Sequence, residues 1–187
     1  MSNTTQTTKS HLPPPPMPPE GKPFEVGATT AVVNTKPDKT VTLRLKRVIK
    51  ASPEKVYNAF LDADALSAWL PPHGFVGKMH AFDGRVGGKF RMSFFTVTKS
   101  WSNTFGGTYL ELVPGRKIVH TDRFETDDPS MQGEMKVTIV LSPAPEGTLV
   151  EIVQEGIPGG PAASGAPYGW SQSLDKLAQL VEPELPF

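Results

Sequence analysis

The chain has 187 residues and a mass of 20.3 kDa, which suits one domain of ordinary size, alone or with a tail. Its 19 Lys and Arg residues balance 19 Asp and Glu residues, so the broad positive surface of a nucleic-acid or anionic-membrane binder is not expected. The chain contains no cysteine, which excludes disulfides, thiol nucleophiles, zinc–thiolate sites and iron–sulfur clusters. A chain without cysteine suits a reducing compartment, and we expect a cytoplasmic protein.

The first 37 residues are rich in proline and carry eight of the 20 prolines of the chain. Four successive prolines at residues 13–16 favour polyproline II, which makes no internal hydrogen bonds and buries little surface. The apolar segment of a secretory signal is missing here. We therefore expect residues 1–37 to form an extended or disordered arm. Two alternatives are a ligand for a groove that reads PxxP, and a strap docked on the domain through residues 31–33.

Residues 38–187 are expected to form one α+β domain. Residues 40–48 alternate apolar and polar side chains, which predicts a strand with one face in water. Ser52, Pro53 and Glu54 then mark a helix start, because Ser caps free amides, Pro fits the first helical position and Glu favours the positive end of the helix. A second short helix over residues 65–70 ends at two prolines, which cannot continue it.

Six further strand-like segments follow, separated by turn residues at the spacing of an antiparallel meander. They are residues 75–82, 89–98, 104–113, 116–125, 134–141 and 148–156. A loop over residues 157–167 leads to a last helix, residues 168–181, which has a single apolar stripe. Only this helix is long enough to cover the sheet. We therefore predict a curved seven-stranded antiparallel sheet wrapped on a long C-terminal helix, with two short helices after strand one. The space between them is the ordinary place for an apolar ligand.

Four motifs occur in the order that is typical of a known family. They are LSAWLPPHGF (residues 66–75), DGRVGGKF (83–90), GTYLELVPGRKIV (107–119) and GWSQSLDKL (169–177). Over residues 40–181 the chain resembles the START-like (SRPBCC) superfamily, in the branch related to the activator of heat-shock-protein-90 ATPase. The resemblance implies a helix-grip fold and an interior cavity, which relatives use for lipids, hormones and polyketide intermediates. It does not imply one reaction, because the superfamily contains both binders and enzymes.

Aromatic side chains cluster in the first half of the predicted sheet and at the exit of the second helix. We predict that nine residues line the cavity: Trp69, Phe75, Arg91, Phe94, Trp101, Tyr109, His120, Phe124 and Trp170. Trp69 and Trp101 are the first choices for its mouth. An inward Arg91 would need an anionic ligand group or a carboxylate partner such as Glu151, whereas an outward Arg91 has no such role. Gln154 is a further candidate for the polar end of the pocket.

His120 and Asp122 are two residues apart, so their side chains share one face of a strand. A carboxylate beside a histidine can fix the tautomer of the imidazole and raise the pKa of the imidazole, which suits a general base. On the cavity face the pair is a candidate for proton abstraction, and on the outer face it is a solvated pair without a role. Because no nucleophile is recognisable, we assign no catalytic residue.

Metal and cofactor sites are not expected. His73 and His80 lie near Asp83 in sequence, but their spacing does not supply a metal site. The glycine-containing turn at residues 83–88 opens a strand rather than a helix, so it lacks the helix N-terminus that binds phosphate.

The sequence thus predicts binding of a small, largely hydrophobic ligand between the sheet and the C-terminal helix, without nucleic-acid binding or membrane insertion. Two alternatives stay open. One is an enzyme of the cyclase/aromatase or hydrolase type that acts in the same cavity. The other is a module that contacts a heat-shock-protein-90-type chaperone through its sheet surface. A pocket lined by aromatic side chains favours binding or catalysis, and a filled interior with an exposed apolar patch favours the partner module.

Overall fold

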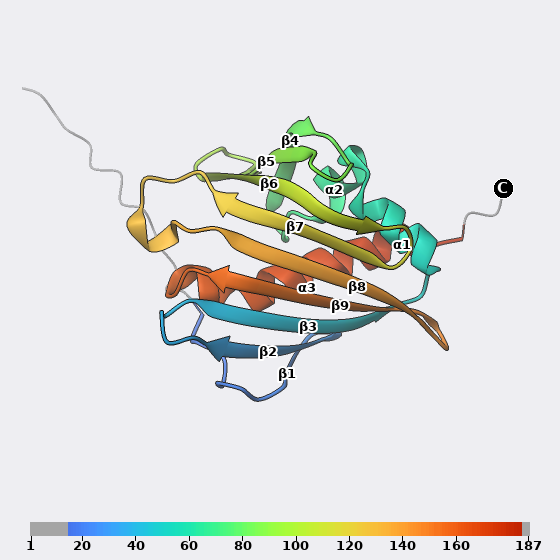
Figure 1. Ribbon diagram of the computed structural model, residues 1–187, viewed down its shortest axis with the longest axis horizontal. Coiled ribbons are helices and arrows are strands. Elements are labelled where there is room, and N and C mark those ends of the chain that lie inside the picture. Colours follow the sequence, from blue (N-terminus) through green and yellow to red (C-terminus); the bar gives the residue numbers. More distant parts are fainter. Residues whose placement is uncertain (1–14, 185–187) are drawn as a thin grey trace, which may run out of the picture.

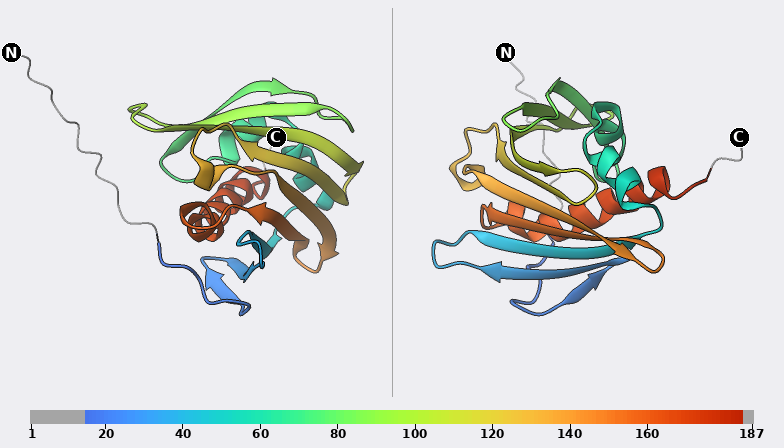
Figure 2. Two further views of the ribbon diagram at one scale, coloured as in Figure 1. Left: turned by 60° about the vertical axis from the view of Figure 1, so that its left-hand side comes forward. Right: turned by 45° about the vertical axis from the view of Figure 1, so that its right-hand side comes forward.

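The computed structural model describes residues 15–184, in which nine strands form one antiparallel sheet and three α-helices lie on its concave side (Figures 1 and 2). The strands are β1 (Phe24–Val26), β2 (Thr29–Thr35), β3 (Val41–Ile49), β4 (Phe75–Phe82), β5 (Lys89–Thr96), β6 (Ser102–Val113), β7 (Lys117–Phe124), β8 (Met135–Ala144) and β9 (Gly147–Ile157). The helices are α1 (Pro53–Phe60), α2 (Ala63–Trp69) and α3 (Pro161–Val181), and a 3₁₀ turn spans Pro129–Met131. This is the α+β architecture of a helix-grip fold.

The sheet order is β1-β2-β3-β9-β8-β7-β6-β5-β4. The six strands β4 to β9 form the predicted meander, because each is hydrogen-bonded to the next in the chain. β3 lies beside β9 and joins the start of the domain to its last strand. The predicted number of seven strands was wrong, since β1 and β2 extend the sheet beyond β3. For the same reason the two short helices follow the third strand rather than the first.

The two added strands come from the proline-rich segment before residue 38. Ala31 and Val33 of β2 are fully buried, and β2 pairs along its length with β3. The carboxylate of Glu20 accepts hydrogen bonds from the amide and hydroxyl of Thr35, at 2.6 and 3.0 Å. This part of the segment therefore lies along the domain, as in the strap alternative. Residues 1–14, which include the first two prolines of the predicted polyproline run, lie outside the described residues.

The short helices begin where capping chemistry predicts. Ser52 accepts a hydrogen bond from the amide of Lys55 at 3.2 Å, and Pro53 occupies the first turn of α1. The side chain of Asp62 caps α2 in the same way, accepting from the amide of Ala65 at 2.7 Å. This cap starts α2 at residue 63, two residues before the predicted start.

Helix α3 begins at Pro161, seven residues earlier than predicted, and the predicted loop over residues 157–167 was wrong for most of its length. The prolines and glycines there had indicated a loop. Pro161 instead takes the first helical turn, where its missing N–H costs no hydrogen bond. Pro167 lies inside the helix, and Ala163 and Pro167 are both buried. Their burial against the domain offsets the loss of one helical hydrogen bond.

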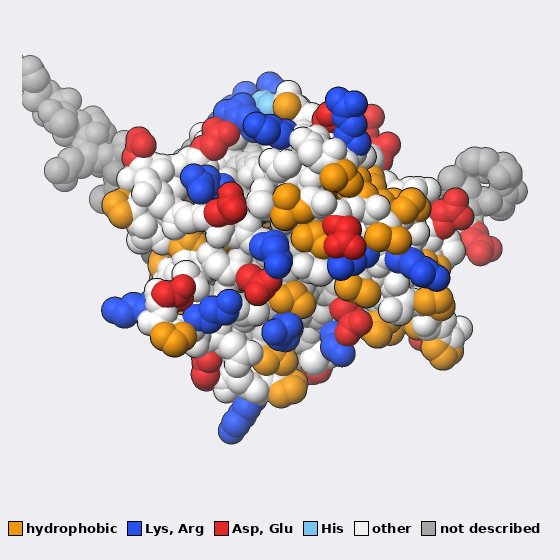
Figure 3. All heavy atoms as spheres, viewed as in Figure 1, with side chains coloured by type: hydrophobic (Ala, Val, Ile, Leu, Met, Phe, Trp, Pro, Cys, Tyr) orange, Lys and Arg blue, Asp and Glu red, His pale blue; other side chains and the backbone are white. Residues whose placement is uncertain are grey.

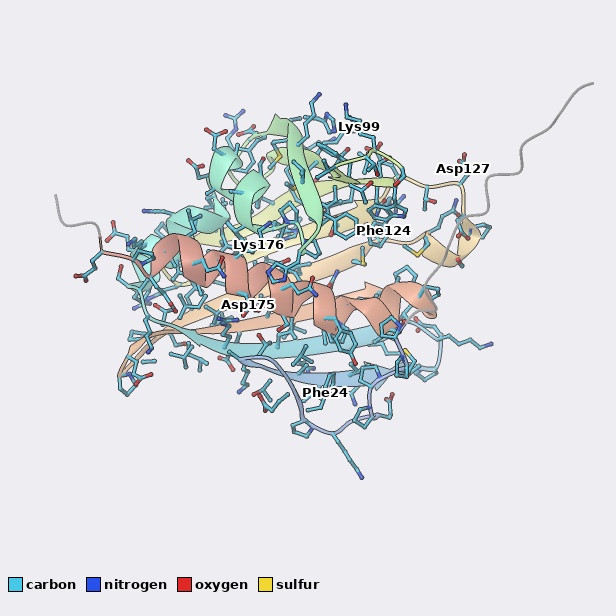
Figure 4. The ribbon with its side chains drawn as sticks, turned by 180° about the vertical axis from the view of Figure 1, so that it is seen from behind. Phe24, Lys99, Phe124, Asp127, Asp175 and Lys176 are labelled. Atoms are coloured by element: carbon cyan, nitrogen blue, oxygen red, sulfur yellow. The ribbon has the colours of Figure 1, made fainter. Side chains whose placement is uncertain are left out.

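Helix α3 lies within the curve of the sheet, as the left view of Figure 2 shows. Two neighbouring residues, both labelled in Figure 4, fix it on different sides. Asp175 pairs with Arg47 of β3, and Lys176 donates a hydrogen bond of 2.8 Å to the carbonyl of Pro71 after α2. The helix is thereby held to both the sheet and the α2–β4 connection. None of the helices within residues 15–184 is long and apolar enough to cross a membrane.

The outer face of the sheet carries positive and negative side chains in alternation (Figure 3). Lys46 and Glu151 form an ion pair of 2.9 Å between β3 and β9, and Lys136 and Glu155 form one of 3.5 Å between β8 and β9. Each exposed pair contributes about 0.2–1 kcal/mol. The mixture leaves this face without the broad single-sign field that steers nucleic acids to a protein.

Candidate functional site

A cavity of about 540 Å³ lies between the concave face of the sheet and α3, within the volume range of small-molecule sites. Its walls come from α2, from strands β4 to β9 and from α3, and most of the lining side chains are apolar or aromatic. Pro15 also lines it, at the start of the described chain. The meander supplies alternate residues to the lining, because successive side chains of a strand point to opposite faces of the sheet.

Eight of the nine residues predicted for the cavity lie in its lining. They are Trp69, Phe75, Phe94, Trp101, Tyr109, His120, Phe124 and Trp170. Phe124 is labelled in Figure 4, which views the molecule from the side of α3. Gln154, named as a possible polar end, lines the cavity as well.

Arg91 was wrongly placed in the cavity. Phe90 and Met92, on either side of it in β5, are buried, so the strand period turns Arg91 to the outer face. There its guanidinium donates two hydrogen bonds, of 2.6 and 2.8 Å, to the carboxylate of Glu125. Glu151, the partner considered for an inward Arg91, also lies outside the lining and pairs with Lys46.

The two tryptophans predicted for the mouth differ in position. Trp69 is only 1% exposed, donates its indole N–H to the carbonyl of Ala59 at 2.9 Å and packs edge-on against Phe60. It is a wall residue, and its placement at the mouth was wrong. Trp101 is 47% exposed and packs against Phe75 with ring centroids 5.1 Å apart. Trp101 therefore lies at the rim of the cavity.

Four lining residues form a row across the middle of the sheet. Tyr109 of β6 is paired with His120 of β7, His120 with Val137 of β8, and Val137 with Gln154 of β9. Residues paired across strands share a face, so the row runs along the cavity floor. The close contact of β6 and β7 near this row requires Gly107, because a Cβ there would overlap the carbonyl oxygen of Thr121.

His120 is a neutral hydrogen-bond acceptor toward the cavity. Its Nδ1 lies 2.8 Å from the carbonyl oxygen of Thr121, which only accepts, so Nδ1 carries the proton and Nε2 keeps a lone pair. Burial lowers the pKa of His120 from 6.5 to about 4, and the rings of Phe90 and Tyr109 pack against it. The prediction that Asp122 fixes the tautomer and raises this pKa was wrong. With a pKa near 4 the imidazole is a weak general base at neutral pH.

Asp122 is the only carboxylate in the described lining, and it has no cation beside it. Its side chain is partly accessible, yet Oδ1 is buried and has no hydrogen-bond partner among the described residues. Burial raises the pKa of Asp122 from 3.8 to about 7, and a hydrogen bond from the amide of Arg123 opposes the rise. The carboxyl therefore holds its proton to a higher pH than an exposed Asp does.

Gln154 joins the sheet to α3 at the edge of this row. Its Oε1 accepts a hydrogen bond of 2.7 Å from the indole N–H of Trp170, and its Nε2 lies 3.3 Å from the sulfur of Met135. Met135 is the cross-strand partner of Asp122, so the amide and the carboxyl lie at the same end of the floor. The site thus combines an aromatic wall with a small group of polar side chains, which is typical of a ligand pocket.

The sequence matches a described family over most of the domain. The family “Activator of Hsp90 ATPase homolog 1-like protein” matches residues 50–182. The chain belongs to this family. A Dictyostelium discoideum protein named “Activator of 90 kDa heat shock protein ATPase homolog” is 31% identical over 137 residues, which are 72% of this chain and 32% of that protein. The chain therefore spans about a third of the length of this relative.

Several solved structures have the same fold as this chain. A crystal structure of a Chromobacterium violaceum protein is 51% identical and superposes with a TM-score of 0.72, covering 76% of this chain and 98% of that one. A Mesorhizobium loti protein is 26% identical, with a TM-score of 0.60 over 74% and 95% of the two chains. A Rhodobacter sphaeroides protein is 21% identical, with a TM-score of 0.66 over 80% and 96%, and shows the likeness of fold alone.

The N-terminal half of α3 is one part of the site that the sequence analysis did not predict. Ala162, Gly165, Ala166 and Tyr168 line the cavity, but the segment before Tyr168 was expected to be a loop. One sequence signal could have predicted the earlier start of α3, because proline is preferred at the first helical position and Pro161 occupies it. Within residues 15–184 of this family member, no group of three His, Asp or Glu side chains is placed to hold a metal ion.

Proposed function

We propose that the protein binds a small, largely apolar molecule in the cavity between the sheet and α3. The observation that carries the proposal is a cavity of about 540 Å³ with an aromatic wall inside an otherwise well-packed domain. Apolar burial contributes about 25 cal/mol per Å² to affinity, and the few polar groups on the floor orient the ligand. The resemblance to the START-like (SRPBCC) superfamily, which implies an interior cavity used for apolar ligands, supports the proposal.

A thermal-shift screen tests the proposal with fatty acids, sterols, flavonoids and polyketide-like aromatics as probes. A probe present at one hundred times its Kd raises the free energy of unfolding by about 2.7 kcal/mol, which is readily seen as a rise in Tm. We expect at least one dose-dependent hit. A screen without any hit at soluble concentrations contradicts the proposal.

A pair of variants at Gly165 shows whether a hit occupies the cavity. Gly165 lies in the lining, and a Cβ there meets no atom within 4 Å. Gly165→Phe places an aromatic ring into the space and should abolish binding, whereas Gly165→Ala adds one methyl group and should keep most of it. A probe that binds both variants as well as the native protein lies elsewhere on the surface.

The relative from Dictyostelium discoideum supports a second candidate function, contact with a heat-shock-protein-90-type chaperone. The name of that protein and the description of the family both refer to activation of this ATPase. The test is a pull-down with the homologous chaperone together with its ATPase rate. Stimulation that survives Gly165→Phe would indicate a surface contact independent of the cavity. No complex at micromolar concentration would count against this function.

A further inference from the structure

The chemistry of the cavity floor restricts the ligand that the cavity can take. The described lining contains no Lys or Arg, and its only titratable side chains are Tyr109, His120, Asp122 and Tyr168. An anionic head group would lose its hydration without gaining a cation, and it would face the carboxyl of Asp122. A carboxylate- or phosphate-bearing ligand therefore does not fit this floor.

Beside Asp122 the polar groups of the floor that remain available are mostly acceptors, and the hydroxyl of Tyr109, which can donate and accept, lies at the end of the row opposite Gln154. The Nδ1 of His120 is taken by the carbonyl of Thr121, which leaves the Nε2 lone pair. The Oε1 of Gln154 is taken by Trp170. The carboxyl of Asp122 has one buried oxygen without a partner, but the residue is partly accessible and lines the cavity, so a bound molecule can reach the carboxyl from the cavity side. A donor on the bound molecule that reaches the carboxyl forms a charge-assisted hydrogen bond with its ionised form and so gains affinity.

A hydroxyl group satisfies this floor in either protonation state of the carboxyl. It donates to the ionised form in a charge-assisted bond, and it accepts a hydrogen bond from the protonated form. An ammonium group is less suitable, because an apolar cavity that already disfavours the charge of Asp122 also makes the cation costly to desolvate.

We propose that the ligand is a neutral, largely apolar molecule whose hydroxyl group docks on the carboxyl of Asp122 beside His120, and that anionic ligands are excluded; this rests on the ligand-binding function proposed above. Asp122 is then the specificity-determining residue, and the aromatic wall supplies affinity without selecting a functional group.

Four fused-ring probes that differ in one substituent test this by titration calorimetry: 9-phenanthrol, 9-methoxyphenanthrene, phenanthrene-9-carboxylate and phenanthren-9-ylmethylammonium. We expect the phenol to bind about tenfold or more tighter than the ether, and the carboxylate to bind most weakly. Equal affinities for phenol and ether overturn the proposal. So does a carboxylate that matches the phenol, or an ammonium probe that binds tightest.

Variants assign the preference to the carboxyl. Asp122→Leu should cut the advantage of the phenol over the ether at least about fivefold while the ether keeps its affinity, because only the phenol uses Asp122. Glu151→Gln, which removes a carboxylate from the outer face, should keep the native preference. A preference that survives Asp122→Leu overturns the assignment. If none of the four probes binds, this inference fails; the ligand-binding function itself fails only if the thermal-shift screen also gives no hit, so the two failures are distinguishable.

Discussion

The indole N–H of Trp170 donates a hydrogen bond of 2.7 Å to the amide oxygen of Gln154, and this bond joins α3 to β9 across the cavity. The two residues come from the helix and the sheet that enclose the cavity, so the bond helps to fix the width of the space between them. It also occupies Oε1 of Gln154, so the acceptors that remain on the described floor are Asp122, His120 and the hydroxyl of Tyr109.

Loss of this bond should destabilise the domain. Trp170→Phe keeps an aromatic ring but leaves the buried Gln154 oxygen without a donor, so we expect the free energy of unfolding to fall by about 1–3 kcal/mol in urea titrations. The matched control is Trp101→Phe at the exposed rim, where no indole hydrogen bond is described and the loss should stay below about 0.5 kcal/mol. Equal losses in the two variants would show that the bond contributes little.

The pH dependence of stability should contain two opposing contributions from the cavity floor. The pKa of Asp122 is raised from 3.8 to about 7, so between these pH values the folded state holds a proton that the unfolded state has lost, and stability falls as pH rises. The pKa of His120 is lowered from 6.5 to about 4, so between those values only the unfolded state holds the proton, and stability rises with pH. In the native protein the two slopes largely cancel where they overlap.

Single variants should reveal each slope. Relative to the native protein, Asp122→Asn should become progressively more stable as pH rises from about 4 to 7, because the penalty of ionising Asp122 is gone. His120→Phe should gain stability relative to the native protein as pH falls from 6.5 to about 4. Urea titrations across this range measure both differences. Differences that do not vary with pH would mean that the two pKa values are close to those of the unfolded chain.

Period-two patterns predicted the meander and showed which side chains of a strand share a face. His120, Asp122 and Phe124 were placed on one face in this way, and all three line the cavity. The same alternation gave no direction for Arg91, since a strand pattern alone does not say which face is inside. Its partner Glu125 lies 34 residues away, and such a pairing follows only from the register of the sheet.

Other features could not be predicted from the sequence because they depend on tertiary contacts. β2 is buried because Ala31 and Val33 meet the body of the domain, although the prolines before them indicated an arm. Likewise, burial of Pro167 stabilises a helical turn that the local propensity of proline disfavours. The tautomer of His120 is set by the carbonyl of the next residue, a contact that no spacing rule predicts.

Breaking the contact between Arg47 and Asp175 should cost far more stability than breaking an exposed ion pair. The Arg47 side chain is only 10% exposed, and its Nε has no partner among the described residues, so removing Asp175 leaves a buried guanidinium without its counter-charge. We expect Asp175→Ala to lower the free energy of unfolding by about 3 kcal/mol. Glu151→Ala, which breaks the exposed pair with Lys46, should cost less than about 1 kcal/mol. Similar losses in both variants would show that the Arg47 charge remains solvated.

Glycine at position 107 should be essential for the close contact of β6 and β7. A Cβ there would overlap the carbonyl oxygen of Thr121, which belongs to the backbone and cannot turn aside, so Gly107→Ala must separate the strands near Tyr109 and His120. We expect a loss of stability on the order of 3 kcal/mol, within the range of strongly destabilising substitutions. Gly165→Ala is the matched control, because its Cβ enters open space on a helix and should stabilise the domain by about 0.5–1 kcal/mol. In chemical denaturation we expect the free energy of unfolding to fall for Gly107→Ala and to rise for Gly165→Ala. A neutral Gly107→Ala would mean that the two strands can separate at this point at no cost to folding.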